Sequence, residues 1–143
     1  MMLRSILAVK GDRVYSTTPD ATLEDVAQAL VKHNCGSLVV CDPQDSRRMV
    51  GIVTERDILR ACAARRPLAE VRVAEAMTSE VIVAHPHDPI DDTMGLMTEN
   101  RIRHLPIVDD DRLVGIISIG DVVKAKHDEL SVENHYLISY IRG

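Results

Sequence analysis

The sequence predicts an α/β (α+β) protein made of two copies of one small unit and a further helix. Two observations carry this expectation. A pattern of apolar residues repeats along the chain, and a short phrase occurs twice, as GIVTERDIL at 51–59 and GIISIGDVV at 115–123. Each copy reads glycine, two β-branched residues, a hydroxyl residue, two variable positions and an aspartate. Internal self-similarity of this kind indicates a duplicated structural unit.

The repeat extends well beyond the phrase. A shift of 67 residues lays Val14 over Val81 and Pro19 over Pro86, and the agreement continues through the stretch that ends at Asp42. After that the shift falls to 64, because a polar turn is three residues shorter in the second copy. Surface turns tolerate such length changes, so the two copies are expected to share one fold.

Each copy predicts the same order of elements. A short strand (14–17, 81–84) precedes a helix, whose start is signalled by a Thr22–Asp25 capping box in the first copy and by Asp88 with Pro89 in the second. Two apolar runs joined by a polar turn then predict a hairpin of buried strands. A second helix begins within the repeated phrase. The order is βαββα twice, and the tail is expected to add a short amphipathic helix.

Composition excludes several classes of protein. The 143 residues carry a formal net charge of −5 and contain no Trp or Phe, so the basic face and the stacking rings of nucleic-acid binders are missing. The core must be aliphatic. Three cysteines without metal-type spacing predict reduced thiols and a cytoplasmic protein. No apolar run approaches the ~20 residues that span a membrane.

The phrase has two interpretations. Thr54 with Asp57, and Ser118 with Asp121, fit capping boxes that simply begin a helix. Alternatively, a helix N-terminus suits anionic oxygens, a hydroxyl donates to phosphate, and a nearby aspartate accepts from the two hydroxyls of ribose. In this second interpretation the phrase's glycine leaves room for a ligand to approach closely. The paired occurrence favours a nucleotide clamp, while caps alone remain the alternative.

These motifs resemble a tandem pair of CBS (cystathionine-β-synthase) domains, a Bateman module. The stretches MTSEVI, LMTENRIRHLPIVDD and LVGIISIGDVVK are similar to those of small stand-alone CBS-pair proteins. The resemblance implies two units related by pseudo-twofold symmetry, at 6–67 and 68–128, with the tail at 129–143 as an expected dimer contact. It also implies two clefts that hold the phosphoribose of adenine nucleotides. No metal site and no required cofactor are expected.

The same resemblance assigns residues to the two clefts. The first cleft is expected to combine the first phrase with residues before the second hairpin, namely Thr54, Arg56, Asp57, Ile102, Arg103 and His104. The second is expected to combine Ser118, Asp121, Cys35, Gly36, Ser37 and Lys10. Because arginines cluster in the first set, together with Arg101, we expect that cleft to bind phosphates better.

The function expected from these features is a non-catalytic sensor of AMP, ATP, ADP or NAD. Its ligand would change the conformation or dimer state, and an unidentified regulated protein would respond, as in energy sensing and signal transduction. The competing interpretation is a ligand-free module for oligomerisation. An enzyme acting on nucleotides, or using metal at His85 and His87, ranks last because the sequence offers no activated nucleophile.

Overall fold

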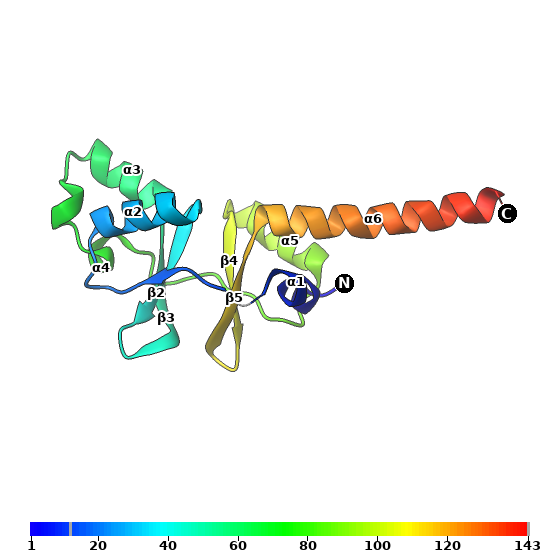
Figure 1. The fold of residues 1–143 in the computed structure, drawn as a ribbon, viewed down its shortest axis with the longest axis horizontal. Coiled ribbons are helices and arrows are strands. Elements are labelled where there is room, and N and C mark those ends of the chain that lie inside the picture. Colours follow the sequence, from blue (N-terminus) through cyan, green and yellow to red (C-terminus); the bar gives the residue numbers. More distant parts are fainter. Residues whose placement is uncertain (12, 143) are drawn as a thin grey trace. The chain divides into compact units, whose positions relative to one another are not determined.

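The computed structural model describes residues 1–11 and 13–142, which divide into two compact units (Figure 1). The first-repeat unit contains residues 13–82 and 109–114. The second-repeat unit contains 1–11, 83–108 and 115–142. The N-terminal residues are therefore grouped with the second half of the chain. The boundaries at 6–67 and 68–128 follow the repeat in sequence and stay a prediction.

The first-repeat unit has the predicted βαββα order. Its short first strand pairs in parallel with the second, which pairs antiparallel with the third. A short 3₁₀ turn, Leu68–Glu70, and a one-turn helix α4 follow. The elements in chain order are β1 (Ser16–Thr17), α2 (Leu23–His33), β2 (Ser37–Asp42), β3 (Asp45–Thr54), α3 (Glu55–Ala63) and α4 (Val73–Ala76).

Local sequence signals explain where α2 begins and ends. The Thr22 side chain accepts from the Asp25 N–H (3.2 Å), and Asp25 accepts from the Thr22 N–H (3.0 Å), so the predicted capping box is present. Asn34 ends the helix in the left-handed region (φ 50°), which Asn tolerates better than most residues. The apolar face of α2 is buried with strands β2 and β3 in an aliphatic core of Leu23, Val26, Leu30, Leu38, Val40, Val53, Ala61, Val71 and Val73.

The second-repeat unit contains helix α1 as well as the second copy of the repeat. Its buried apolar side chains include Leu3 of α1, Met97 of α5 and Val122 of α6. The two strands β4 and β5 are neighbours in a two-stranded sheet. The elements are α1 (Leu3–Lys10), α5 (Ile90–Asn100), β4 (His104–Asp109), β5 (Arg112–Ser118) and α6 (Ile119–Arg142). The tip of the β4–β5 hairpin, at 109–114, is grouped with the first-repeat unit.

Two expectations for this unit were wrong in detail. The strand expected over 81–84 is reduced to one parallel bridge between Ala84 and Ile107. Asp88 does not cap α5, because its carboxylate accepts from the His85 N–H (2.9 Å) and the capping position is Pro89. The Asp88 carboxylate, which was expected to cap the helix, therefore stabilises the turn before α5 instead.

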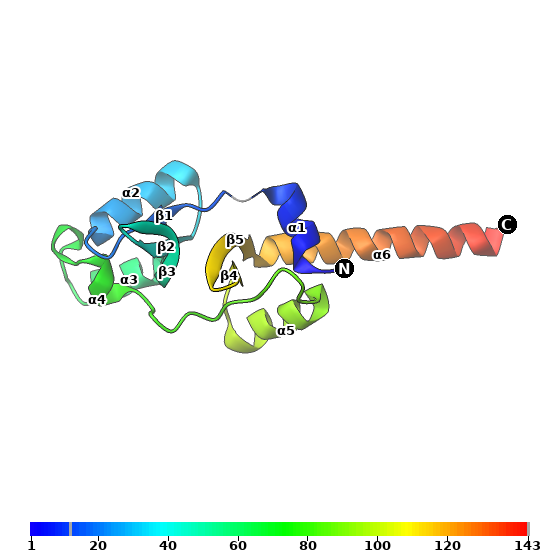
Figure 2. The ribbon, with the colours of Figure 1, turned by 90° about the horizontal axis from the view of Figure 1, so that it is seen from below.

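The tail does not form a separate short helix. It continues α6 as one helix of 24 residues, and its outer part extends beyond the rest of its unit in both views (Figures 1 and 2). No Gly or Pro interrupts the chain between Asp121 and Arg142, so nothing in the sequence ends the helix earlier. Residues 130–142 are all exposed.

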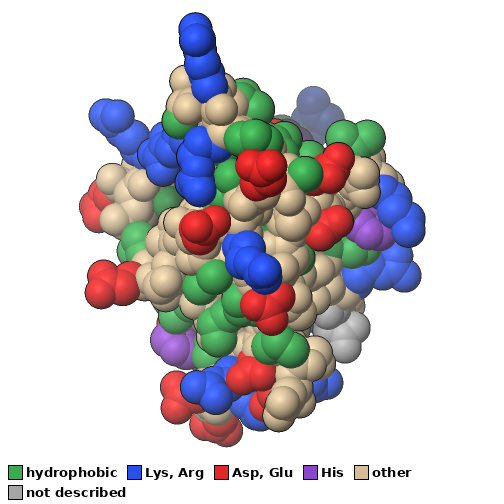
Figure 3. Space-filling model, turned by 90° about the vertical axis from the view of Figure 1, so that its left-hand side faces the viewer, with side chains coloured by type: hydrophobic (Ala, Val, Ile, Leu, Met, Phe, Trp, Pro, Cys, Tyr) green, Lys and Arg blue, Asp and Glu red, His purple; other side chains and the backbone are tan. Residues whose placement is uncertain are grey.

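The surface mixes charges of both signs. On the face drawn in Figure 3, lysine, arginine, aspartate and glutamate side chains alternate with apolar ones rather than forming one basic field. This agrees with the acidic net charge of −5. Within 1–11 and 13–142, no helix has the length and apolar character needed to cross a membrane.

Candidate functional site

The first copy of the phrase forms the junction between β3 and α3. Strand β3 ends at Thr54 and α3 begins at Glu55. The Thr54 N–H donates to Asp57 Oδ2 (2.8 Å), and the Thr54 hydroxyl lies 3.4 Å from the same oxygen. Asp57 is buried, with 8% of its surface exposed, and its nearest cation is Arg60 Nη1, 3.9 Å from Oδ1. Asp57 Oδ2 thus caps the start of α3, whereas Oδ1 has only a long contact with Arg60 among the described residues.

The second copy makes an equivalent junction between β5 and α6. The Ser118 N–H donates to Asp121 Oδ2 (2.9 Å), and the Asp121 N–H donates to Ser118 Oγ (3.1 Å). Both copies are therefore capping boxes at the end of a strand. The expected capping role of the phrase is therefore confirmed at both junctions. Any additional role in ligand binding has to rest on further observations.

A cation within hydrogen-bonding distance of the aspartate distinguishes the second junction from the first. Lys10, the last residue of α1, donates from Nζ to Asp121 Oδ2 (2.6 Å) and to the carbonyl of Ile116 (2.9 Å). Partial burial alone would raise the pKa of Asp121, but the hydrogen bonds from Lys10 and from the Ser118 N–H outweigh burial and hold this pKa below its usual range. The structure thus brings together three predicted residues of the second set, Lys10, Ser118 and Asp121.

Residues 35–37 lie beside the first junction. The Glu55 N–H donates to the Gly36 carbonyl (3.0 Å), and Ser37 is the register partner of Thr54 across β2 and β3. Ser37 is buried, with 5% of its surface exposed, and its hydroxyl has no hydrogen-bond partner within the described part of the chain. A buried hydroxyl without a partner costs about 1–3 kcal/mol, so this one requires an explanation.

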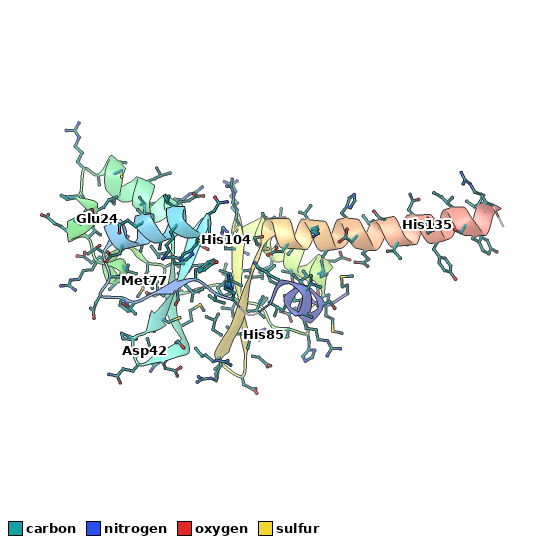
Figure 4. The ribbon with its side chains drawn as sticks, in the orientation of Figure 1. Glu24, Asp42, Met77, His85, His104 and His135 are labelled. Atoms are coloured by element: carbon teal, nitrogen blue, oxygen red, sulfur yellow. The ribbon has the colours of Figure 1, made fainter. Side chains whose placement is uncertain are left out.

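Residues 102–104 lie beside the second junction. The Ile119 N–H donates to the Arg103 carbonyl (2.8 Å), and His104 begins β4 close to the start of α6 (Figure 4). Each phrase therefore contacts the residues that precede the hairpin of its own unit. The predicted combinations of Thr54 and Asp57 with 102–104, and of Ser118 and Asp121 with 35–37, join residues of different units and stay predictions.

The unit to which Arg103 belongs bears on which of the two sites is expected to bind phosphate better. Arg103 and Lys10 both belong to the unit that contains Asp121, whereas neutral residues 35–37 contact the first phrase. Arg56 is exposed in the first turn of α3. Within their own units, Asp121 pairs with Lys10 at 2.6 Å and Asp57 with Arg60 at 3.9 Å. The expectation that the first cleft binds phosphates better stays a prediction.

The two glycines do not leave room for a ligand. A Cβ at Gly51 would lie 2.7 Å from Met77 Sδ and 2.8 Å from the Thr78 carbonyl, and Met77 lies beside the strands of this unit (Figure 4). A Cβ at Gly115 would lie 2.6 Å from Leu7 Cδ2. The space beside each glycine is filled by the chain itself, so the expectation that these glycines admit a ligand was wrong.

Comparison with known proteins identifies the family. The model of the CBS domain matches twice, at residues 8–64 and 73–128, and this chain belongs to the CBS-domain family. It is 39% identical over 136 residues to the mitochondrial CBS domain-containing protein CBSX3 of Arabidopsis thaliana. The match covers 93% of this chain but 66% of that protein, just under two thirds of its length.

Solved structures of CBS proteins share the fold. The CBS-domain protein ATU1752 of Agrobacterium tumefaciens has a TM-score of 0.82 at 37% identity, covering 88% of this chain and 99% of that one. The protein PAE2072 of Pyrobaculum aerophilum, solved with AMP, has a TM-score of 0.76 at 31% identity, covering 85% and 89%. The CBS pair of MJ0100, solved with 5-methylthioadenosine and S-adenosylmethionine, has a TM-score of 0.76 at 29% identity, covering 90% and 98%.

Proposed function

We propose that this chain is a non-catalytic regulatory module that binds an adenine nucleotide at its two strand-to-helix junctions. The observation that carries the proposal is the buried Ser37 hydroxyl beside the first junction, which has no partner among the described residues. A capping role accounts for Thr54 and Asp57 but not for Ser37. The presence of AMP or adenosyl compounds in related structures supports an adenine ligand.

The proposed contacts follow from the chemistry of each group. Asp57 and Asp121 accept hydrogen bonds from ribose hydroxyls, and the positive ends of the helix dipoles at the starts of α3 and α6 attract phosphate. The sets 35–37 and 102–104 line the sites, with Arg56, Arg103 and His104 as further phosphate contacts. Adenine packs against aliphatic side chains, since the chain contains no Phe or Trp.

A signalling role requires that the ligand favour one of two states of the protein. We propose a homodimer in which α6 forms part of the contact, because the outer part of this helix exposes Leu137, Tyr140 and Ile141. An unidentified regulated protein then responds to the change, which suits a sensor of adenylate energy charge. Three unpaired cysteines suit a reducing compartment such as the cytoplasm.

Calorimetry with AMP, ADP, ATP, NAD and S-adenosylmethionine tests the proposal. We expect at least one of these compounds to bind, and Asp57→Ala to weaken binding by about 1.5–3 kcal/mol, the value of a lost charged acceptor. Asp25→Ala is the matched control, because Asp25 makes the same capping box at α2 but lies at neither phrase. The Asp25→Ala variant also loses a helix cap, but we expect it to bind the adenine compound with wild-type affinity.

The ligand-free module remains the second candidate, because both phrases do form capping boxes. It predicts that no adenine compound shifts the melting temperature. It also predicts that Asp57→Ala and Asp25→Ala differ from wild type only in stability. Equal ligand affinity in Asp57→Ala and wild type, within a factor of two, would remove Asp57 from the site.

A further inference from the structure

Lys10 is held at the second junction by two hydrogen bonds. Its ammonium donates to Asp121 Oδ2 (2.6 Å) and to the Ile116 carbonyl (2.9 Å). Gly11, whose φ of 90° few other residues adopt, ends α1 directly after it. The side chains of Lys10 and Asp121 are 33% and 28% exposed, so the pair is partly shielded from water. An ammonium has three donors, and two of these are used.

The first junction has no charged group in the corresponding place. The repeat lays Ile116 over Ile52, and Ile52 exchanges two backbone hydrogen bonds with Thr78 (3.0 and 2.9 Å). In the second-repeat unit, the donor to the equivalent strand carbonyl is a lysine side chain instead of a backbone N–H. That donor carries a positive charge, and it also reaches the aspartate of the phrase.

This arrangement penalises some ligands and favours others. Ribose hydroxyls that approach Asp121 compete with Lys10 for its carboxylate, so a neutral nucleoside weakens a charge-assisted bond without replacing it. A phosphate near the ribose gives the ammonium a new anionic partner, while the Ile116 carbonyl keeps the lysine in place. A cationic adenosyl compound adds a second positive charge beside it.

We propose that Lys10 is a specificity residue of the Asp121 site, which makes that site select phosphorylated adenine nucleotides over neutral nucleosides and cationic adenosyl compounds. The inference rests on the proposed function, since it needs a nucleotide at Asp121. It assigns Lys10 a dual role, as the counterion of Asp121 in the unliganded protein and as a phosphate contact in the liganded one.

The test compares the affinities of AMP and adenosine by calorimetry. The binding event that is lost in Asp121→Asn is the one that belongs to this site. In the wild type we expect AMP to bind at that site at least about tenfold more tightly than adenosine, as for one charge-assisted bond. Lys10→Met should reduce this ratio to about threefold or less, partly through tighter adenosine binding. Lys10→Gln, which keeps a donor for the Ile116 carbonyl, should do the same, and Lys10→Arg should keep the preference.

The matched control is Lys126→Met. Lys126 belongs to the same unit, its side chain is 26% exposed, and its ammonium pairs with Asp91 at 2.9 Å. Among the described residues it forms no ion pair with Asp121. We expect this variant to keep the wild-type ratio. If AMP binds at Asp121 and neither Lys10→Met nor Lys10→Gln changes the ratio, the inference is overturned while the proposed function stands. If no adenine compound binds the wild type or any variant, both fall.

Discussion

Asp57 and Asp121 occupy equivalent positions but differ in their surroundings. Each carboxylate uses Oδ2 to accept from the N–H of the hydroxyl residue in its phrase, Thr54 or Ser118. Asp57 is more buried, and among the described residues its cation is Arg60 at 3.9 Å, whereas Asp121 pairs with Lys10 at 2.6 Å. A duplicated motif can thus keep its backbone role in both copies while its side-chain chemistry diverges.

The glycines of the phrase are required by packing, which makes a prediction at this scale. Gly51→Ala should destabilise the fold by about 1–3 kcal/mol, because its Cβ would overlap the Met77 sulfur and the rigid Thr78 carbonyl. Gly115→Ala should cost less, since the only close atom is the end of the flexible Leu7 side chain. Chemical denaturation measures both.

Gly95→Ala provides the control for these substitutions. It lies inside α5, where an added Cβ would have no described atom within 4 Å, and alanine favours helix over glycine by about 0.5–1 kcal/mol. We expect it to stabilise the protein. A Gly51→Ala variant as stable as wild type would show that Met77 and Thr78 move aside readily.

At the scale of elements, the sequence predicted what depends on local pattern. The hairpins β2–β3 and β4–β5 and the capping box of α2 are confirmed. The 81–84 strand depended on pairing partners, which pattern alone does not supply, and only one bridge formed. The tail was expected to be a separate short helix because its apolar residues suit an amphipathic helix, yet helices end at breakers, and none is present between Asp121 and Arg142.

The length of α6 leads to a prediction about association. Residues 130–142 are exposed throughout, and a helical segment of this length is marginal in water without packing. Leu130, Leu137 and Ile141 recur at heptad spacing on the exposed helix. Leu137→Asp should therefore dissociate the proposed homodimer, which sedimentation velocity measures.

His135→Asp introduces the same charge two residues earlier, at a position that Figure 4 labels on the outer part of α6. It lies outside the heptad positions, and we expect it to sediment like the wild type. A wild-type protein that sediments as a monomer across the micromolar range would contradict the dimer proposal.

At the scale of the whole molecule, the grouping of α1 could not be predicted from the repeat. The pattern places 1–11 ahead of the first copy, but the Leu3 N–H donates to the Asp88 carbonyl and the Arg4 N–H to the Pro86 carbonyl. Both acceptors precede α5 in the second copy. The family resemblance, and not the repeat, placed Lys10 with Asp121, and the ion pair between them depends on this long-range grouping.

Leu3 makes the grouping testable. It is fully buried in the second-repeat unit, so Leu3→Ala should lower the free energy of unfolding by about 2–5 kcal/mol. Hydrogen exchange should quicken in α5 and the start of α6 more than in α2 and α3. Arg4→Ala, at an exposed neighbouring position, is the control, and equal loss of protection in both units would contradict the grouping.

The grouping of α1 also has a consequence for synthesis on the ribosome. Most of the first-repeat unit is one continuous stretch, 13–82, whereas the second-repeat unit needs 1–11 together with segments made much later. Helix α1 is therefore synthesised well before the segments at 83–108 and 115–142 with which it packs. Its apolar residues, Leu3 and Ile6 among them, are the part of the growing chain that a chaperone would have most reason to shield.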